Sequence, residues 1–162
     1  MTIPKGLQTS VREVYNYSML YQQLQVEQIT ALKSKDTLKL QTIRGIIAQI
    51  KNKEIEKKAA LTEDEVILVI KKAKKELLES IGSFTKGGRT DLIAESQKQL
   101  EIVNVYLPPE LSDEELQIAI SNLIENNKDA IAINPKAIIG ICMKELRNKA
   151  ESSRILAILQ KS

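Results

Sequence analysis

The sequence predicts an all-α protein, and three observations point to this class. Apolar residues recur three and four positions apart in several segments, which is the repeat of one helix face. Residues that cap helix starts precede these segments. With six glycines and four prolines among 162 residues, the chain has too few turn residues for a many-stranded β fold. We expect an N-terminal bundle of about four helices, followed by a small unit of three helices.

The first two helices are expected over residues 19–33 and 37–58. The first carries apolar side chains near helical spacing at Leu20, Leu24 and Ile29. Asp36 follows a polar break and is a good cap for the second helix. That helix repeats apolar residues in steps of three, four and three at Leu40, Ile43, Ile47 and Ile50. Arg44 lies beside this stripe, where its guanidinium can reach a carboxylate or a phosphate.

Two longer helices follow in the first half of the chain. Thr62 and Glu65 form a capping box that opens a helix to about residue 86. Its predicted buried stripe is Val66, Ile70, Ala73, Leu77, Ile81 and Phe84. The pair at 87–88 is Gly-Gly and supplies a left-handed residue at the helix end. Thr90 or Asp91 is expected to cap the next helix, whose core side carries Leu92, Ile93, Leu100, Val103 and Tyr106.

The second half of the chain predicts three shorter helices. Ser112 and Glu115 form another capping box, and the helix to about residue 126 places Leu116, Ile120, Leu123 and Ile124 inside. Asn134 is expected to cap the sixth helix, with a proline in its first turn. Asn148 is expected to end it in the left-handed conformation. The last helix, 153–160, turns Ile155, Leu156 and Leu159 toward the core.

A Pro-Pro pair at 108–109 divides these helices into two groups, because proline ends the helix that runs into it. We expect residues 1–20 to be an N-terminal extension and 21–106 to be the helical domain. Residues 107–111 are predicted to form a semi-rigid hinge, and 112–162 to form the three-helix tail-like domain.

Charge is unevenly distributed along the chain. Residues 1–90 carry 16 basic and 10 acidic side chains, a net +6. Residues 91–135 carry two basic and nine acidic side chains, a net −7, and residues 136–162 carry six and two, a net +4. A polyanion would be drawn to the two ends and repelled by the middle. The simpler interpretation is that these charges are ordinary solvated helix faces.

The composition excludes the common catalytic and metal sites. No histidine is present, which removes Ser-His-acid and Cys-His catalysis and the commonest metal ligand. Cys142 is the only cysteine, lies in an apolar run, and is interpreted as a core residue. Glu114 and Glu115 lie at a helix start, so we interpret them as capping residues and not as catalytic acids or bases. We expect no catalytic residue, no metal and no cofactor.

The sequence also indicates where the protein works. No run of 18 or more apolar residues occurs, so no membrane span is expected. A single cysteine fits a reducing compartment, which favours the cytoplasm. The alternative is an organelle, if residues 1–20 are the remnant of a targeting segment.

The remaining candidates are basic side chains that contact phosphates. Four crowd the end of the sixth helix and the start of the last: Lys144, Arg147, Lys149 and Arg154. A second group lies on the third helix: Lys71, Lys72, Lys74 and Lys75. No module that reads bases accompanies them, so RNA would be recognised by its backbone and shape. Tyr15, Tyr17 and Tyr21 either stack on unpaired bases or pack the start of the first helix, and packing is favoured.

Several motifs together resemble those of the YqeY-like proteins. The most specific is Tyr106-Leu-Pro-Pro-Glu-Leu-Ser-Asp-Glu-Glu-Leu116, supported by the segments 36–55, 61–65 and 86–89. The resemblance covers residues 21–160. YqeY-like proteins are related to the helical tail of the B subunit of the glutamyl/aspartyl-tRNA amidotransferase. The resemblance therefore implies two helical domains, the second similar to the tail that contacts tRNA.

This resemblance leaves three functions to weigh. The first is a non-catalytic accessory protein that associates with tRNA. The second is a protein-interaction module that docks on amidotransferase subunits or on another partner. The third is carbon–nitrogen ligase activity with glutamine as amide donor, which rests on kinship alone, because the amidotransferase's catalytic machinery resides in other domains and another subunit.

Overall fold

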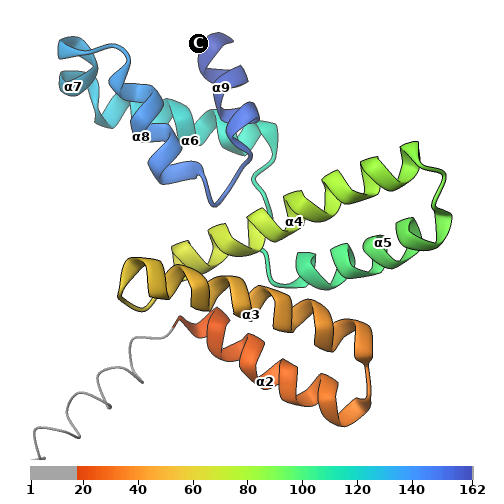
Figure 1. Cartoon of the computed structure of the whole chain (residues 1–162). Helices are drawn as coiled ribbons and strands as arrows, with labels where there is room; N and C mark the ends of the chain where they lie inside the picture. The colour runs from red at the N-terminus through yellow and green to blue at the C-terminus, as the bar shows by residue number, and fades with distance from the viewer. Residues whose placement is uncertain (1–17, 162) are drawn as a thin grey trace, which may run out of the picture. The chain divides into compact units, whose positions relative to one another are not determined.

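The structure is a computed structural model that describes residues 18–161 (Figure 1). These residues form eight helices and no strand, which confirms the all-α prediction. The chain divides into two compact units, Met1–Leu107 and Pro108–Ser162. Each unit has a hydrophobic core of its own.

The first unit consists of two helical hairpins. They are formed by α2 (Met19–Ser34) with α3 (Thr37–Lys57), and by α4 (Glu63–Lys86) with α5 (Thr90–Val105). Asp36 accepts a hydrogen bond from the Lys39 N–H at 3.1 Å, which confirms it as the cap of α3. The Thr62–Glu65 capping box of α4 is confirmed as well. The first unit therefore begins three of its helices with side-chain caps, Ser18 being the cap of α2.

The buried faces of the first two helices differ in part from the prediction. Ile29 lies near helical spacing with Leu20 and Leu24, but 55% of it is exposed. The inward face instead continues from Leu24 through Glu27 to Ala31, in steps of three and four. In α3 the buried set includes Ile46, which the predicted stripe omitted.

The residues that end one helix and begin the next were predicted only in part. Gly88 has φ +67°, as the left-handed prediction required. Lys35 and Lys58 also adopt left-handed φ values, 59° and 58°, and end α2 and α3 without a glycine. The cap of α5 was predicted wrongly: Arg89 holds that position without a side-chain hydrogen bond, because Asp91 lies inside the helix and pairs with Arg89.

The second unit contains α6 (Asp113–Asn126), α7 (Lys128–Ile133), α8 (Ala137–Leu146) and α9 (Ser152–Lys161). Its core is built from residues of α6, α8, α9 and the turn before α9: Leu116, Ile120, Cys142, Leu146, Ala150 and Ile155. The Ser112–Glu115 capping box of α6 is confirmed.

Three details of this unit correct the prediction. The described part of the tail has four helices instead of three, because residues 128–133 form the short helix α7. Asn134 does not cap α8: its side chain accepts the Lys136 N–H, which makes a turn before the helix starts at Ala137. Asn148 is not in the left-handed conformation, and the N–H groups of Lys149 and Ala150 both donate to the Leu146 carbonyl.

Candidate functional site

The described residues hold no cluster that resembles a metal centre. Between residues 18 and 161, no three His, Cys, Asp or Glu side chains lie together as metal ligands would. Cys142 is fully buried, and burial raises the pKa of its thiol. A thiol held neutral inside a core is a poor nucleophile. The two surfaces described next are candidate binding sites.

The first candidate surface is the basic turn of the tail, defined here as Lys144, Arg147 and Lys149. Lys144 stands in the last turn of α8, and the other two belong to the turn that follows. All three side chains are exposed. The turn is held in place because the carbonyl of Lys149 accepts the Leu111 N–H at 2.8 Å. Beside it, the Asn148 Oδ1 is buried without a hydrogen-bond partner, the only such side-chain atom among residues 18–161.

Arg154, the fourth predicted phosphate contact, lies in a different environment. Its guanidinium donates to Asp113 at 2.6 Å, to Glu110 at 3.2 Å and to the Leu111 carbonyl at 2.8 Å. The hydrogen bond to Asp113 raises the pKa of Arg154. Its positive charge is thus balanced inside the tail, and its donors fasten the segment before α6 to α9.

The predicted lysines of α4 lie in two environments. Lys72 and Lys75 each approach a glutamate one turn later, Glu76 and Glu79, at 3.8 and 3.9 Å. Such exposed pairs are weak, and they leave ammonium donors open to other partners. Lys71 and Lys74 are half-buried.

A hydrogen-bonded network ties Tyr106 to the start of the chain. The Tyr106 hydroxyl donates to Glu27 at 2.6 Å, and the Lys39 ammonium approaches the same carboxylate at 2.8 Å. Burial raises the pKa of Glu27, but hydrogen bonds from Lys39, Tyr106 and Gln23 outweigh it, and the pKa lies below its ordinary value. Burial and the Glu27 carboxylate raise the pKa of Tyr106 well above its ordinary range.

Of the clustered tyrosines, Tyr21 lies in the core of the first unit, as the packing interpretation predicts. Tyr15 and Tyr17 fall outside the described residues.

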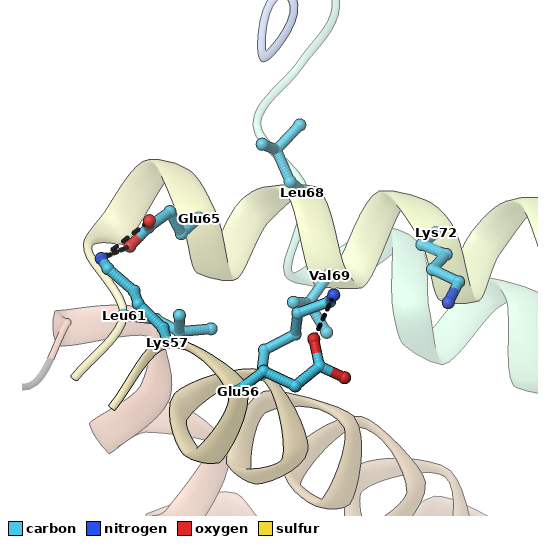
Figure 2. Close-up of a pocket in the computed structure, with 8 residues that line it drawn as sticks. Glu56, Lys57, Leu61, Glu65, Leu68, Val69 and Lys72 are labelled. Carbon is cyan, nitrogen blue, oxygen red and sulfur yellow. Dashed lines mark hydrogen bonds and ion pairs between the residues drawn. The ribbon is translucent and has the colours of Figure 1, made fainter. Parts of the chain in front are cut away.

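The second candidate surface is a groove between the end of α3 and the first turns of α4, with a volume of about 540 Å³ (Figure 2). We call it the α3–α4 groove. Its apolar lining comes from Leu61, Leu68 and Val69, and its cationic lining from Lys53, Lys57 and Lys72. Sequence reasoning missed this groove. The available signal was the recurrence of lysines on both sides of the loop at 58–62, of which those at 71–75 were predicted to contact phosphates.

Two glutamates hold the lysines of this groove. Glu65 accepts hydrogen bonds from the Thr62 backbone and from Lys57, the latter at 2.6 Å. Lys53 donates to Glu56 at 2.7 Å. The hydrogen bond from Lys57 lowers the pKa of Glu65, and the hydrogen bond from Lys53 lowers that of Glu56, so both carboxylates stay ionised at neutral pH.

Comparison with known proteins decides the family. The family model described as Yqey-like protein matches residues 21–162. The match covers the second unit in full and the first unit from residue 21 onward. The chain belongs to the YqeY-like family. The predicted resemblance is therefore confirmed.

Curated relatives of this YqeY-like chain are fungal proteins named altered inheritance of mitochondria protein 41, mitochondrial. The one from Lachancea thermotolerans is 32% identical over 76% of this chain and 66% of its own length. The one from Clavispora lusitaniae is 30% identical over 85% of this chain and 79% of its own length. The chain thus spans about two thirds of the first relative. No helix among the described residues is both long and apolar enough to cross a membrane.

Proposed function

We propose that this YqeY-like protein is a non-catalytic accessory protein that binds tRNA through the basic turn of its tail. The observation that supports this most directly is the exposure of Lys144, Arg147 and Lys149 along one short stretch of chain. The region 136–162 carries six basic and two acidic side chains, so a polyanion meets a net +4 there.

Chemically, this surface suits a phosphate backbone better than bases. Arginine binds a phosphate through two parallel N–H groups, and lysine binds it as a point charge. The tail carries no aromatic residue, since all four tyrosines and the single phenylalanine precede residue 107. Stacking on bases therefore contributes nothing in the tail, and recognition rests on the shape and charge of a folded RNA. Arg154 acts as a positioning residue that holds α9 beside the basic turn.

A salt series tests this proposal. We expect bulk tRNA to bind the full chain at low salt, and the logarithm of the affinity to fall linearly with the logarithm of the salt concentration. Replacing Lys144, Arg147 and Lys149 together by alanine should reduce the slope by about one for each phosphate that the variant no longer binds. The matched control replaces three exposed lysines of the first unit, Lys33, Lys86 and Lys98.

An unchanged slope in the tail variant, or an equal reduction in the control, would refute the proposal. A reduction only when the α4 lysines are replaced (Lys71, Lys72, Lys74 and Lys75) would move the RNA surface to the first unit.

The α3–α4 groove favours a second function, in which the protein docks on another protein such as an amidotransferase subunit. Pull-down with nuclease treatment separates the two functions, because a partner retained after RNA is digested is held by protein contacts. The suggestion of ligase activity rests on family kinship alone. A glutamine-dependent amidation assay with the purified chain by itself should show no turnover.

The names of the relatives also bear on location. Those proteins are named as mitochondrial, so we propose an organellar location for this chain in place of the cytoplasmic one first expected. Fractionation of cells that express the tagged full chain tests this. Recovery in the cytosol alone would refute it.

A further inference from the structure

We propose that the α3–α4 groove is a docking site for a short amphipathic segment of a partner protein, one that carries carboxylates beside large apolar side chains. The inference rests on the docking function above, and its surface lies in the first unit, away in sequence from the basic turn of the tail.

The apolar part of the groove supplies the first argument. Leu61 comes from the loop before α4, and Val69 points from α4 toward α3 (Figure 2). A volume of about 540 Å³ lies in the range of sites that take a drug-sized ligand or a few side chains. An amphipathic helix that lays its apolar face into a groove is a recurring mode of peptide recognition.

The charged part of the groove supplies the second argument, which is charge complementarity. Three ammonium groups line it, against two carboxylates. Each ammonium has three donors, and the carboxylates occupy only part of them. Lys72 is less tightly paired than Lys53 and Lys57. Its ion pair with Glu76 spans 3.8 Å, and Glu56 acts on it through charge. A partner carboxylate therefore finds open donors, whereas a partner lysine meets repulsion.

The two glutamates give the groove its order. Glu65 is fixed by the capping box that starts α4, and it holds Lys57 at one end (Figure 2). Glu56 holds Lys53 within its own helix. The lysines are thus partly ordered before a ligand arrives, which lowers the entropy lost on binding.

Fluorescence anisotropy with a defined probe tests the site. The probe is a labelled 16-residue helical peptide with leucines at every third and fourth position and glutamates beside them. Its counterpart has lysines in place of the glutamates. We expect the acidic peptide to bind the full chain and the basic peptide not to bind.

Charge reversals on each side of the groove identify the surface. Lys72→Glu and Lys53→Glu should each lower the affinity for the acidic peptide by about fivefold or more. The matched controls are Lys75→Glu, whose pair with Glu79 has nearly the same geometry, and Lys51→Glu on α3. Neither control lies in the groove.

Three outcomes would overturn the inference. They are absence of binding at low salt, equal binding of both peptides, and equal weakening in the groove variants and the controls. If these charge reversals weaken the binding of tRNA, and the acidic peptide does not bind the natural chain, the groove is an RNA surface and the docking inference fails. The tRNA titration of the tail variant is independent of every one of these results, so each proposal can fail alone.

Discussion

Removing the Tyr106 hydroxyl probes a long-range hydrogen bond of the first unit. In Tyr106→Phe the ring stays in the core, and only the 2.6 Å hydrogen bond to Glu27 is removed. These residues lie 79 positions apart, so the bond closes the unit from its first helix to its last residues.

The magnitude follows from what Glu27 retains. A hydrogen bond to a charged group contributes about 1.5–3 kcal/mol. Glu27 keeps Lys39 at 2.8 Å and Gln23 at 3.1 Å, and 25% of its side chain is exposed, so solvent and other donors offset part of the loss. We expect the free energy of unfolding of the first unit to fall by about 1–1.5 kcal/mol. For a domain of about 100 residues this lowers Tm by about 4–8 °C per kcal/mol.

Urea unfolding can be followed for each unit separately. All four tyrosines precede residue 107, so tyrosine emission reports the first unit. The only cysteine is Cys142, so its labelling by a thiol reagent reports opening of the second. Tyr106→Phe should shift the tyrosine transition and leave Cys142 labelling unchanged.

A double-mutant cycle with Glu27→Gln isolates the pair. We expect Tyr106→Phe to cost about 0.5–1 kcal/mol less in the Glu27→Gln background, since the acceptor is then neutral. A destabilisation below about 0.3 kcal/mol in the natural background, or the same destabilisation in both, would refute the argument.

The pH dependence of the same variant has a defined sign. The folded pKa of Glu27 is depressed, so its contribution is present above its ordinary value of 4.5 and is lost as pH falls through the folded pKa. The folded pKa of Tyr106 is raised, so the contribution of the neutral phenol is present below 10.0 and is lost as pH rises from there toward the folded pKa. The stability difference between wild type and Tyr106→Phe should therefore be largest between these limits and narrow on both sides. A difference that stays constant down to pH 3 would contradict this assignment.

Three further predictions address the rest of the chain. Arg154→Ala should speed the labelling of Cys142 about three- to tenfold, because the segment before α6 loses its tie to α9; an unchanged rate would contradict the positioning role. Lys35→Gly should raise the free energy of unfolding by about 0.5–1 kcal/mol, because its left-handed φ suits glycine, and urea unfolding that shows a decrease would contradict this. Limited proteolysis should cut at 87–90 before it cuts at 107–111, because proline restricts the second segment, and rapid cutting at 107–111 would refute the predicted semi-rigid hinge.

Features set by neighbouring residues could be predicted from the sequence. The caps at Asp36, Thr62 and Ser112 are hydrogen bonds between a side chain and the backbone N–H three residues later, so the local sequence determines them. Lys35 could not be predicted, because lysine has no preference for the left-handed region and adopts it only where the next helix requires the turn. The helix α7 was missed because six residues are too few to show a period.

The candidate sites show the same limit in their charges. From the sequence alone, Arg154 and Lys144 are equally good candidates for contacting a phosphate. The structure separates them, because three groups from a segment 41–44 residues away balance Arg154, whereas the Lys144 side chain is exposed. Which cation is already neutralised depends on tertiary contacts, and no spacing rule reaches across that separation.

The Pro-Pro segment brings these two lessons together. On its N-terminal side, the Tyr106 hydroxyl is bonded to Glu27, and Leu107 packs against the first core. On its C-terminal side, the Leu111 N–H donates to Lys149 and the Leu111 carbonyl accepts from Arg154. Each unit thus fixes its own end of the segment. Pro108 and Pro109 are left between the two anchors, and proline has a fixed φ and no N–H to donate. The semi-rigid hinge over residues 107–111 stays a prediction, and it places the restriction at Pro108 and Pro109, between the two anchors.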